Sequence, residues 1–172
     1  MFYLYHRWLP SMRGRTLYPL SQMKEKWPDL WEVHMRRYSS RRELSELRIP
    51  LLNCGWHDVI FFSAVHPQAM RSALREAKIE WPIMKSYRIP ASALRADRAA
   101  VLLGASAPGC AFEYEAYDPD DMEMYKDIPP RVLEYYKACR SAGETPFLFH
   151  GITQILYRGT LNIAGLEIEE GR

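Results

Sequence analysis

Cysteine motifs are missing from this 172-residue chain, whose three cysteines lie far apart and form no CxxC pair. Their odd number and wide spacing argue against a disulfide framework and against a zinc ribbon. We therefore expect a reduced, cytoplasmic protein. HxxxH and HExxH spacings are absent as well, so any metal site would have to gather ligands from distant segments. We expect no metal.

Long apolar runs and a strong net charge are also missing. No stretch approaches the about 20 apolar residues of a membrane helix, and the N-terminus lacks the layout of a signal peptide, so we expect no membrane contact. A formal net charge of +2 favours no class of partner. With 48% apolar and 26% charged residues, the composition is that of one globular domain over residues 1–172.

Charge is unevenly distributed despite this balance. Residues 1–48 contain ten Lys or Arg against five Asp or Glu, and residues 113–127 contain seven acids against Lys126. The densest basic group is Arg36, Arg37, Arg41 and Arg42, whose guanidinium groups suit phosphates and so predict nucleic acid or another polyanion. The alternative, which we favour, is a solvated helix face or a face paired with the acidic segment.

Apolar periodicity predicts an α+β fold in one domain, with helices mainly in the N-terminal half and a central mixed or antiparallel sheet. Residues 59–63 form a short apolar run that we expect to be a buried strand in the sheet interior. Pro130 and Gly143 bracket a well-formed helix. Further helices are expected at 21–27, 28–38, 40–47, 67–77 and 119–125, and further strands at 2–6, 83–89, 99–103, 147–149, 155–157 and 166–168.

Polar side chains bracket the expected strand at 59–63. An Asp beside a His can orient the ring or raise its basicity, so His57 and Asp58 are candidate catalytic residues, with Asn53 as a substrate-binding neighbour. The alternative is that Asp58 and Asn53 cap a loop, because Asx side chains bond to nearby backbone in turns.

The other end of the same run carries Ser63 and His66. His66-Pro67 opens a helix, whose N-terminus can bind a phosphate or carboxylate, although ordinary capping is the alternative. We count Ser63 and His66 as candidate substrate-binding residues. The grouping predicts that Asn53, His57, Asp58 and His66 open onto one shared pocket.

In outline, the chain resembles the ADP-ribosyltransferase-like proteins, especially the compact branch that modifies nucleic acid. The similarity rests on an N-terminal strand ending in Tyr5-His6-Arg7, helices after it, and a strand ending in Phe61-Phe62-Ser63 followed by a helix. A terminal extended stretch at 147–149, then residues 155 and 166–168, completes it. The resemblance implies that His6 and Ser63 lie in a cleft that holds NAD.

One feature departs from this resemblance. The family places a catalytic Glu at the head of its last core strand, where this chain offers Pro146, with Glu144 two residues early. The resulting hypothesis is an enzyme or sensor that binds a nucleotide, NAD by preference, through His6, Asn53, His57, Ser63 and His66. The alternative is a non-enzymatic interaction protein, whose basic and acidic faces bind a protein or nucleic acid.

Overall fold

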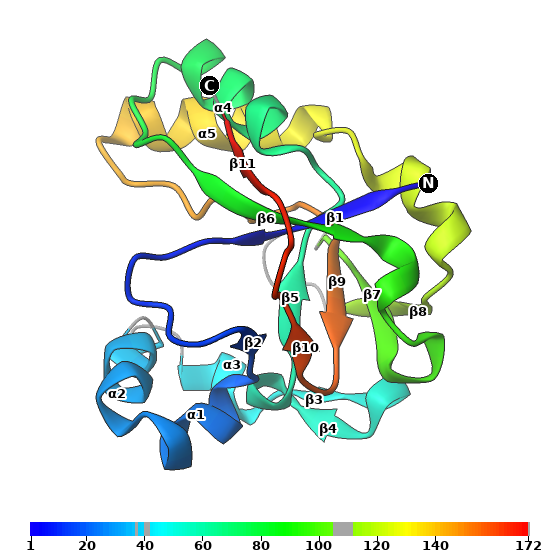
Figure 1. The fold of residues 1–172 in the computed structure, drawn as a ribbon. Helices are drawn as coiled ribbons and strands as arrows, with labels where there is room; N and C mark the ends of the chain where they lie inside the picture. The colour runs from blue at the N-terminus through cyan, green and yellow to red at the C-terminus, as the bar shows by residue number, and fades with distance from the viewer. Residues whose placement is uncertain (37, 40–41, 105–111, 172) are drawn as a thin grey trace.

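Helices and short antiparallel strands alternate irregularly along the chain (Figure 1). The computed structural model describes residues 1–36, 38–39, 42–104 and 112–171. The helices are α1 Leu20–Lys26, α2 Pro28–Arg36, α3 Arg42–Glu46, α4 Pro67–Glu76 and α5 Pro130–Ala142. The strands are β1 Tyr3–Arg7, β2 Thr16–Leu17, β3 Arg48–Ile49, β4 Cys54–Gly55, β5 Ile60–Phe62, β6 Lys85–Pro90, β7 Ala99–Leu103, β8 Glu113–Ala116, β9 Gln154–Tyr157, β10 Leu161–Asn162 and β11 Ile168–Glu170. Turns of 3₁₀ helix are η1 Pro50–Leu52, η2 Trp56–Asp58, η3 Ala91–Ala93, η4 Ala96–Arg98 and η5 Pro119–Tyr125. The α+β class expected from the sequence is confirmed.

Two sheets meet at one point of β1. The first has the order β1-β6-β11 and the second the order β5-β9-β7-β8. Tyr5 and Ser63 exchange both of their backbone hydrogen bonds, at 2.8 and 3.0 Å, and so join β1 to the end of β5. The pairings therefore run β11-β6-β1-β5-β9-β7-β8, and β1 contacts β5 only near this pair (Figure 1).

Alternating side chains of β5 and β9 divide the core, as the two-residue period of a strand requires. Phe62 and Ile155 pack with Leu4 in the cluster between the two sheets. Phe61 and Leu156 face the other side, where η1, η2 and the β3–β4 pair cover the sheet. Both faces of β5 are therefore occupied by protein.

Helices α4 and α5 begin at the prolines that the sequence indicates, and α5 ends at the glycine that it indicates. Pro67 and Pro130 stand in the first turns of α4 and α5, where a missing N–H costs nothing. Gly143 ends α5 in the left-handed conformation with φ 72°. The two helices share a buried cluster that includes Leu74 and Tyr136. In the described part of the chain, no helix combines the length and apolar character needed to cross a bilayer.

The strand expected at 147–149 is wrong. These residues form a turn in which His150 donates its N–H to the Phe147 carbonyl, and Gly151 follows with φ 72°. Tyr136 donates its hydroxyl to the Leu148 carbonyl, so the turn is packed against α5. Burial against a helix therefore accounts for an apolar run that resembles a strand in the sequence.

The strand expected at 59–63 is present in shortened form as β5. Val59, Ile60, Phe62 and Ser63 are all buried, as predicted. Val59 ends the turn η2 and lies outside the strand. β5 is an edge strand of the four-stranded sheet, but β1 lies along its outer side at the Tyr5–Ser63 pair.

Candidate functional site

The junction of β1, β5 and β9 brings three strand positions side by side. Tyr5 pairs with Ser63, and Phe62 pairs with Ile155. Gln154, the first residue of β9, precedes Ile155 and pairs with Leu102 on β7. The sheet thus aligns two segments of the resemblance, which are distant in sequence, with the start of β9.

His6 follows Tyr5 on β1 and has a fixed tautomer. Its Nδ1 lies 2.8 Å from the Phe61 carbonyl oxygen. Because a carbonyl only accepts, Nδ1 carries the hydrogen, and in the neutral ring Nε2 keeps a lone pair. Burial lowers the pKa of His6, the bond to the Phe61 carbonyl opposes this, and the nearby His34 lowers it further. At neutral pH, His6 is therefore an uncharged ring that presents one hydrogen-bond acceptor.

We expect the protein to lose stability as the pH falls. Burial lowers the pKa of both His6 and His57 below the usual histidine value of 6.5. Both rings are neutral above that pH in the folded and unfolded chains, so they contribute no pH dependence there. Below it the unfolded chain binds protons that the folded protein does not, and the free energy of unfolding decreases. His6 alone accounts for at most about 1.4 kcal/mol per pH unit.

Urea unfolding at a series of pH values from neutral to mildly acidic tests this expectation. His6→Asn should flatten the acid limb, because it removes one titrating group. A free energy of unfolding that stays constant as the pH falls below the histidine range would contradict the assignment of a neutral His6.

Ser63, a predicted substrate-binding residue, is 3% exposed. Its Oγ accepts a hydrogen bond from the Val65 N–H at 3.1 Å, which bends the chain away from the sheet after β5. The hydroxyl can still donate its hydrogen. In this structure, the Ser63 hydroxyl therefore bonds the local backbone, two residues further along the chain.

Asp58 caps a turn in the way the alternative interpretation describes. Its Oδ2 accepts the Gly55 N–H at 2.8 Å. Burial raises the pKa of Asp58, but the hydrogen bonds from Gly55 and Ser21 outweigh burial and hold it below its usual range. His57, the other candidate catalytic residue, packs edge-on against the Tyr38 ring at 4.8 Å. Within the described residues, no hydrogen bond joins His57 to Asp58.

Asn53 also has a local structural role. It ends η1 in the left-handed conformation with φ 46° and ψ 48°, which Asn tolerates better than most residues. Arg48 donates to its Oδ1 at 3.4 Å, a long hydrogen bond. Asn53, His57 and Asp58 therefore share the end of the sheet that is formed by η1, η2 and the β3–β4 pair.

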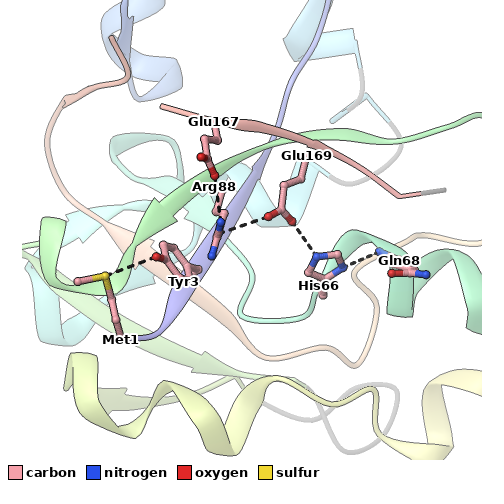
Figure 2. Close-up of polar contacts among 7 residues, drawn as sticks. All are labelled: Met1, Tyr3, His66, Gln68, Arg88, Glu167 and Glu169. Atoms are coloured by element: carbon pink, nitrogen blue, oxygen red, sulfur yellow. Dashed lines mark hydrogen bonds and ion pairs between the residues drawn. The ribbon is translucent and has the colours of Figure 1, made fainter. Parts of the chain in front are cut away.

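His66 lies at the opposite end of β5, where it caps α4 (Figure 2). Its Nδ1 accepts the Gln68 N–H at 3.1 Å, and its Nε2 lies 2.7 Å from the Glu169 carboxylate on β11. Both ring nitrogens are therefore engaged, with Nε2 as the donor. Neither is left to act as a base toward a ligand.

A pocket of about 380 Å³ lies beside His66, between the start of β1, the first turn of α4 and η5. Asn53, His57 and Asp58 do not line it. The expectation that these residues and His66 open onto one shared pocket is wrong, because β5 separates the two groups (Figure 1).

The basic cluster does not pair with the acidic segment in the described residues. Arg36 and Arg42 are exposed, whereas Arg37 and Arg41 lie outside the described residues. The acidic segment has its own partners, since Lys126 pairs with Glu123 at 2.6 Å and Tyr125 donates to Glu115. Helix α2 and strand β8 lie on different sides of the molecule (Figure 1). The interpretation that the two faces pair is therefore wrong for the arginines that can be placed.

Three side chains of this region do not stand out in the sequence. Gln154 precedes the strand expected at 155–157, and it is the first residue of β9. Arg88 and Glu169 meet across β6 and β11, with Arg88 Nε 3.3 Å from the Glu169 carboxylate. The C-terminal segment carries Glu167, Glu169 and Glu170, but no local signal in the sequence predicts that Glu169 meets Arg88.

Comparison with known proteins gives this site no relative. No family model, curated protein or solved structure matches the chain. Among the described residues, no group of three or more His, Cys, Asp or Glu side chains is placed to hold a metal ion. What the chain does must therefore be inferred from its own geometry.

Proposed function

We propose that this protein binds a nucleotide, NAD by preference, at the junction of β1, β5 and β9, as an enzyme or sensor of the ADP-ribosyltransferase-like kind. The observation that supports it best is the fixed tautomer of His6. A neutral ring whose Nδ1–H is held by the Phe61 carbonyl offers Nε2 as an acceptor. A ribose hydroxyl is a donor that suits it.

The surroundings of His6 support the same ligand. The ring lies 5.5 Å from the Phe62 ring, and burial lowers its pKa, so its surroundings are poorly solvated. A hydrogen bond is worth more in such surroundings than in water. Ser63, which the resemblance also implies, directly follows β5 and pairs with Tyr5, the residue before His6. The proposal therefore retains His6 and Ser63, and it omits Asn53, His57 and Asp58.

Gln154 limits the proposal to binding. The resemblance implies a glutamate at the head of the last core strand, a position that the sequence assigns to Pro146. Residues 147–149 form no strand, and the next strand along the chain, β9, begins with Gln154. An amide can position a sugar hydroxyl by hydrogen bonding, but it can neither take a proton nor place a negative charge beside a positively charged sugar. The proposal is therefore one of NAD binding, and it assigns no residue to the transfer of ADP-ribose.

Calorimetric titration of the protein with NAD tests the proposal, together with mass spectrometry of the protein as purified. We expect saturable binding of NAD, weaker binding of AMP, and a rise in the melting temperature with NAD concentration. Absence of saturable binding by NAD and by other nucleotides would overturn the proposal.

A second candidate function is binding of nucleic acid by the basic cluster, favoured by the exposed Arg36 and Arg42. If it binds phosphates, affinity for single-stranded or double-stranded DNA or RNA should fall steeply with salt. Replacing Arg36 and Arg42 by Ala should weaken binding to all sequences alike and flatten the salt slope by about 1 for each lost phosphate contact. Titrations at two salt concentrations measure both effects. Arg75→Ala on α4 is a matched control. Nucleic-acid affinity that stays the same after Arg36 and Arg42 are replaced would exclude this function.

A further inference from the structure

The pocket beside His66 lies on the side of β1 that faces away from His6. Side chains alternate along a strand, so Tyr3 and Tyr5 point to one side and His6 to the other. The pocket volume of about 380 Å³ is at the lower end of the range for small-molecule sites. Its walls are mostly aromatic or apolar: Phe2, Tyr3, Tyr5, Ala64, Ala69 and Met122.

The polar groups that support these walls are already paired (Figure 2). His66 is held at both ring nitrogens, by the Gln68 N–H and by the Glu169 carboxylate. The Arg88 guanidinium lies 3.7 Å from the centre of the Tyr3 ring and pairs with Glu167 and Glu169. This wall therefore already holds a cation against an aromatic ring, in an arrangement that the carboxylates on β11 stabilise.

The residues that η5 and its end contribute to the lining carry more negative than positive charge. They are Glu123, Lys126 and Asp127. Lys126 and Glu123 neutralise each other in an ion pair of 2.6 Å. Within the described residues, no ion pair holds the carboxylate of Asp127. An anionic ligand would meet this charge, whereas a cation would be attracted to it.

We propose that this pocket binds a small organic cation of the quaternary or alkylated ammonium class. Aromatic rings attract such cations through their electron-rich faces, and the bulky alkyl groups bury apolar surface. The Asp127 carboxylate supplies the long-range attraction. This pocket is separate from the proposed nucleotide site, so neither proposal depends on the other.

An NMR titration with choline, compared with 3,3-dimethyl-1-butanol, tests the pocket. The alcohol has the same shape without the charge. We expect choline to bind about 5- to 30-fold more tightly, as a partly desolvated cation–π contact implies. The amide signals of Ala64, Ala69 and Lys126 should shift, and those of Arg48 and Asn53 should not.

Two variants assign the contacts. Tyr5→Leu keeps an apolar side chain on β1 and removes the ring, and it should weaken choline binding about 5-fold or more. Asp127→Asn changes an exposed side chain that forms no ion pair with any residue that the structure describes. It should weaken choline binding about 2- to 5-fold and leave binding of the alcohol unchanged, with Glu144→Gln as the matched control.

Equal affinity for choline and the alcohol would overturn the proposal, because it would show that the positive charge of the ligand does not contribute to binding. Absence of saturable shifts at the pocket amides would also overturn it. Retention of full choline affinity by Asp127→Asn, with the fold intact, would remove the carboxylate from the site.

Discussion

Replacement of Phe62 by alanine is expected to lower the free energy of unfolding by about 3–5 kcal/mol. Phe62 is 2% exposed and lies in the cluster between the two sheets. Its backbone pairs with Ile155 on β9, and its ring contacts His6 on β1. Truncation leaves a cavity at the point where the two sheets meet, and neighbours on short paired strands cannot close around it.

The loss is large against the total stability of a domain of this size, which is about 5–15 kcal/mol. Urea unfolding followed by circular dichroism measures it. Phe61→Ala is the matched control, because the neighbouring side chain is half-buried on the other face of β5. We expect a clearly smaller loss from Phe61→Ala. Equal losses from the two variants would contradict the division of the core at β5.

Elements with local signals could be predicted from the sequence. Helix α5 follows from Pro130 at its start, Gly143 at its end, and apolar residues at helical spacing between them. Strand β7 follows from an uninterrupted apolar run whose first four residues are all buried. In both cases the cap or the period is contained within the segment itself, so no knowledge of distant residues is needed.

Long-range pairings could not be predicted in this way. Tyr5 and Ser63 join the two sheets across 58 positions of the sequence, and Glu169 on β11 closes on His66 at the start of α4. Neither contact has a sequence signal, because a strand edge of mixed polar residues accepts many partners. The strand predicted at 147–149 also depended on a distant partner. The run packs against α5 and not in a sheet, and the segment itself carries no signal for this.

The structure separates side chains that the sequence groups together. His6 and Ser63 lie near the contact between β1 and the end of β5, whereas His57 and His66 lie at opposite ends of β5. Proximity along the chain suggested one pocket, whereas an extended strand carries its two ends apart by about 3.3 Å per residue. The side chains of Asp58 and His66 accept hydrogen bonds from nearby backbone N–H groups, and Asn53 takes a left-handed turn conformation, a local role that short polar side chains often have in turns.

His6→Asn is expected to weaken NAD binding about 10-fold or more. The asparagine amide occupies the place of Nδ1 and can still donate to the Phe61 carbonyl, while the Nε2 acceptor is lost. A donor on the ligand is then left unpaired in poorly solvated surroundings, which costs about 1–3 kcal/mol. His6→Gln reverses the exchange, because its longer side chain places an amide oxygen near the position of Nε2. It should bind NAD better than His6→Asn while unfolding at a lower urea concentration, since the Phe61 carbonyl loses its donor.

The pH dependence gives the same assignment a second readout. Binding requires the neutral ring, and burial holds the pKa of His6 below the usual histidine value of 6.5. Affinity for NAD should therefore be constant from mildly alkaline to neutral pH, and should fall only in acid, where protonation fills the Nε2 lone pair. In His6→Gln the acid limb should disappear. His57→Asn is the control, because His57 lies beside Tyr38 and Ser45 at the other end of β5 and should leave both affinity and pH profile unchanged. Unchanged NAD affinity in His6→Asn, with the fold intact, would place the nucleotide elsewhere on the protein.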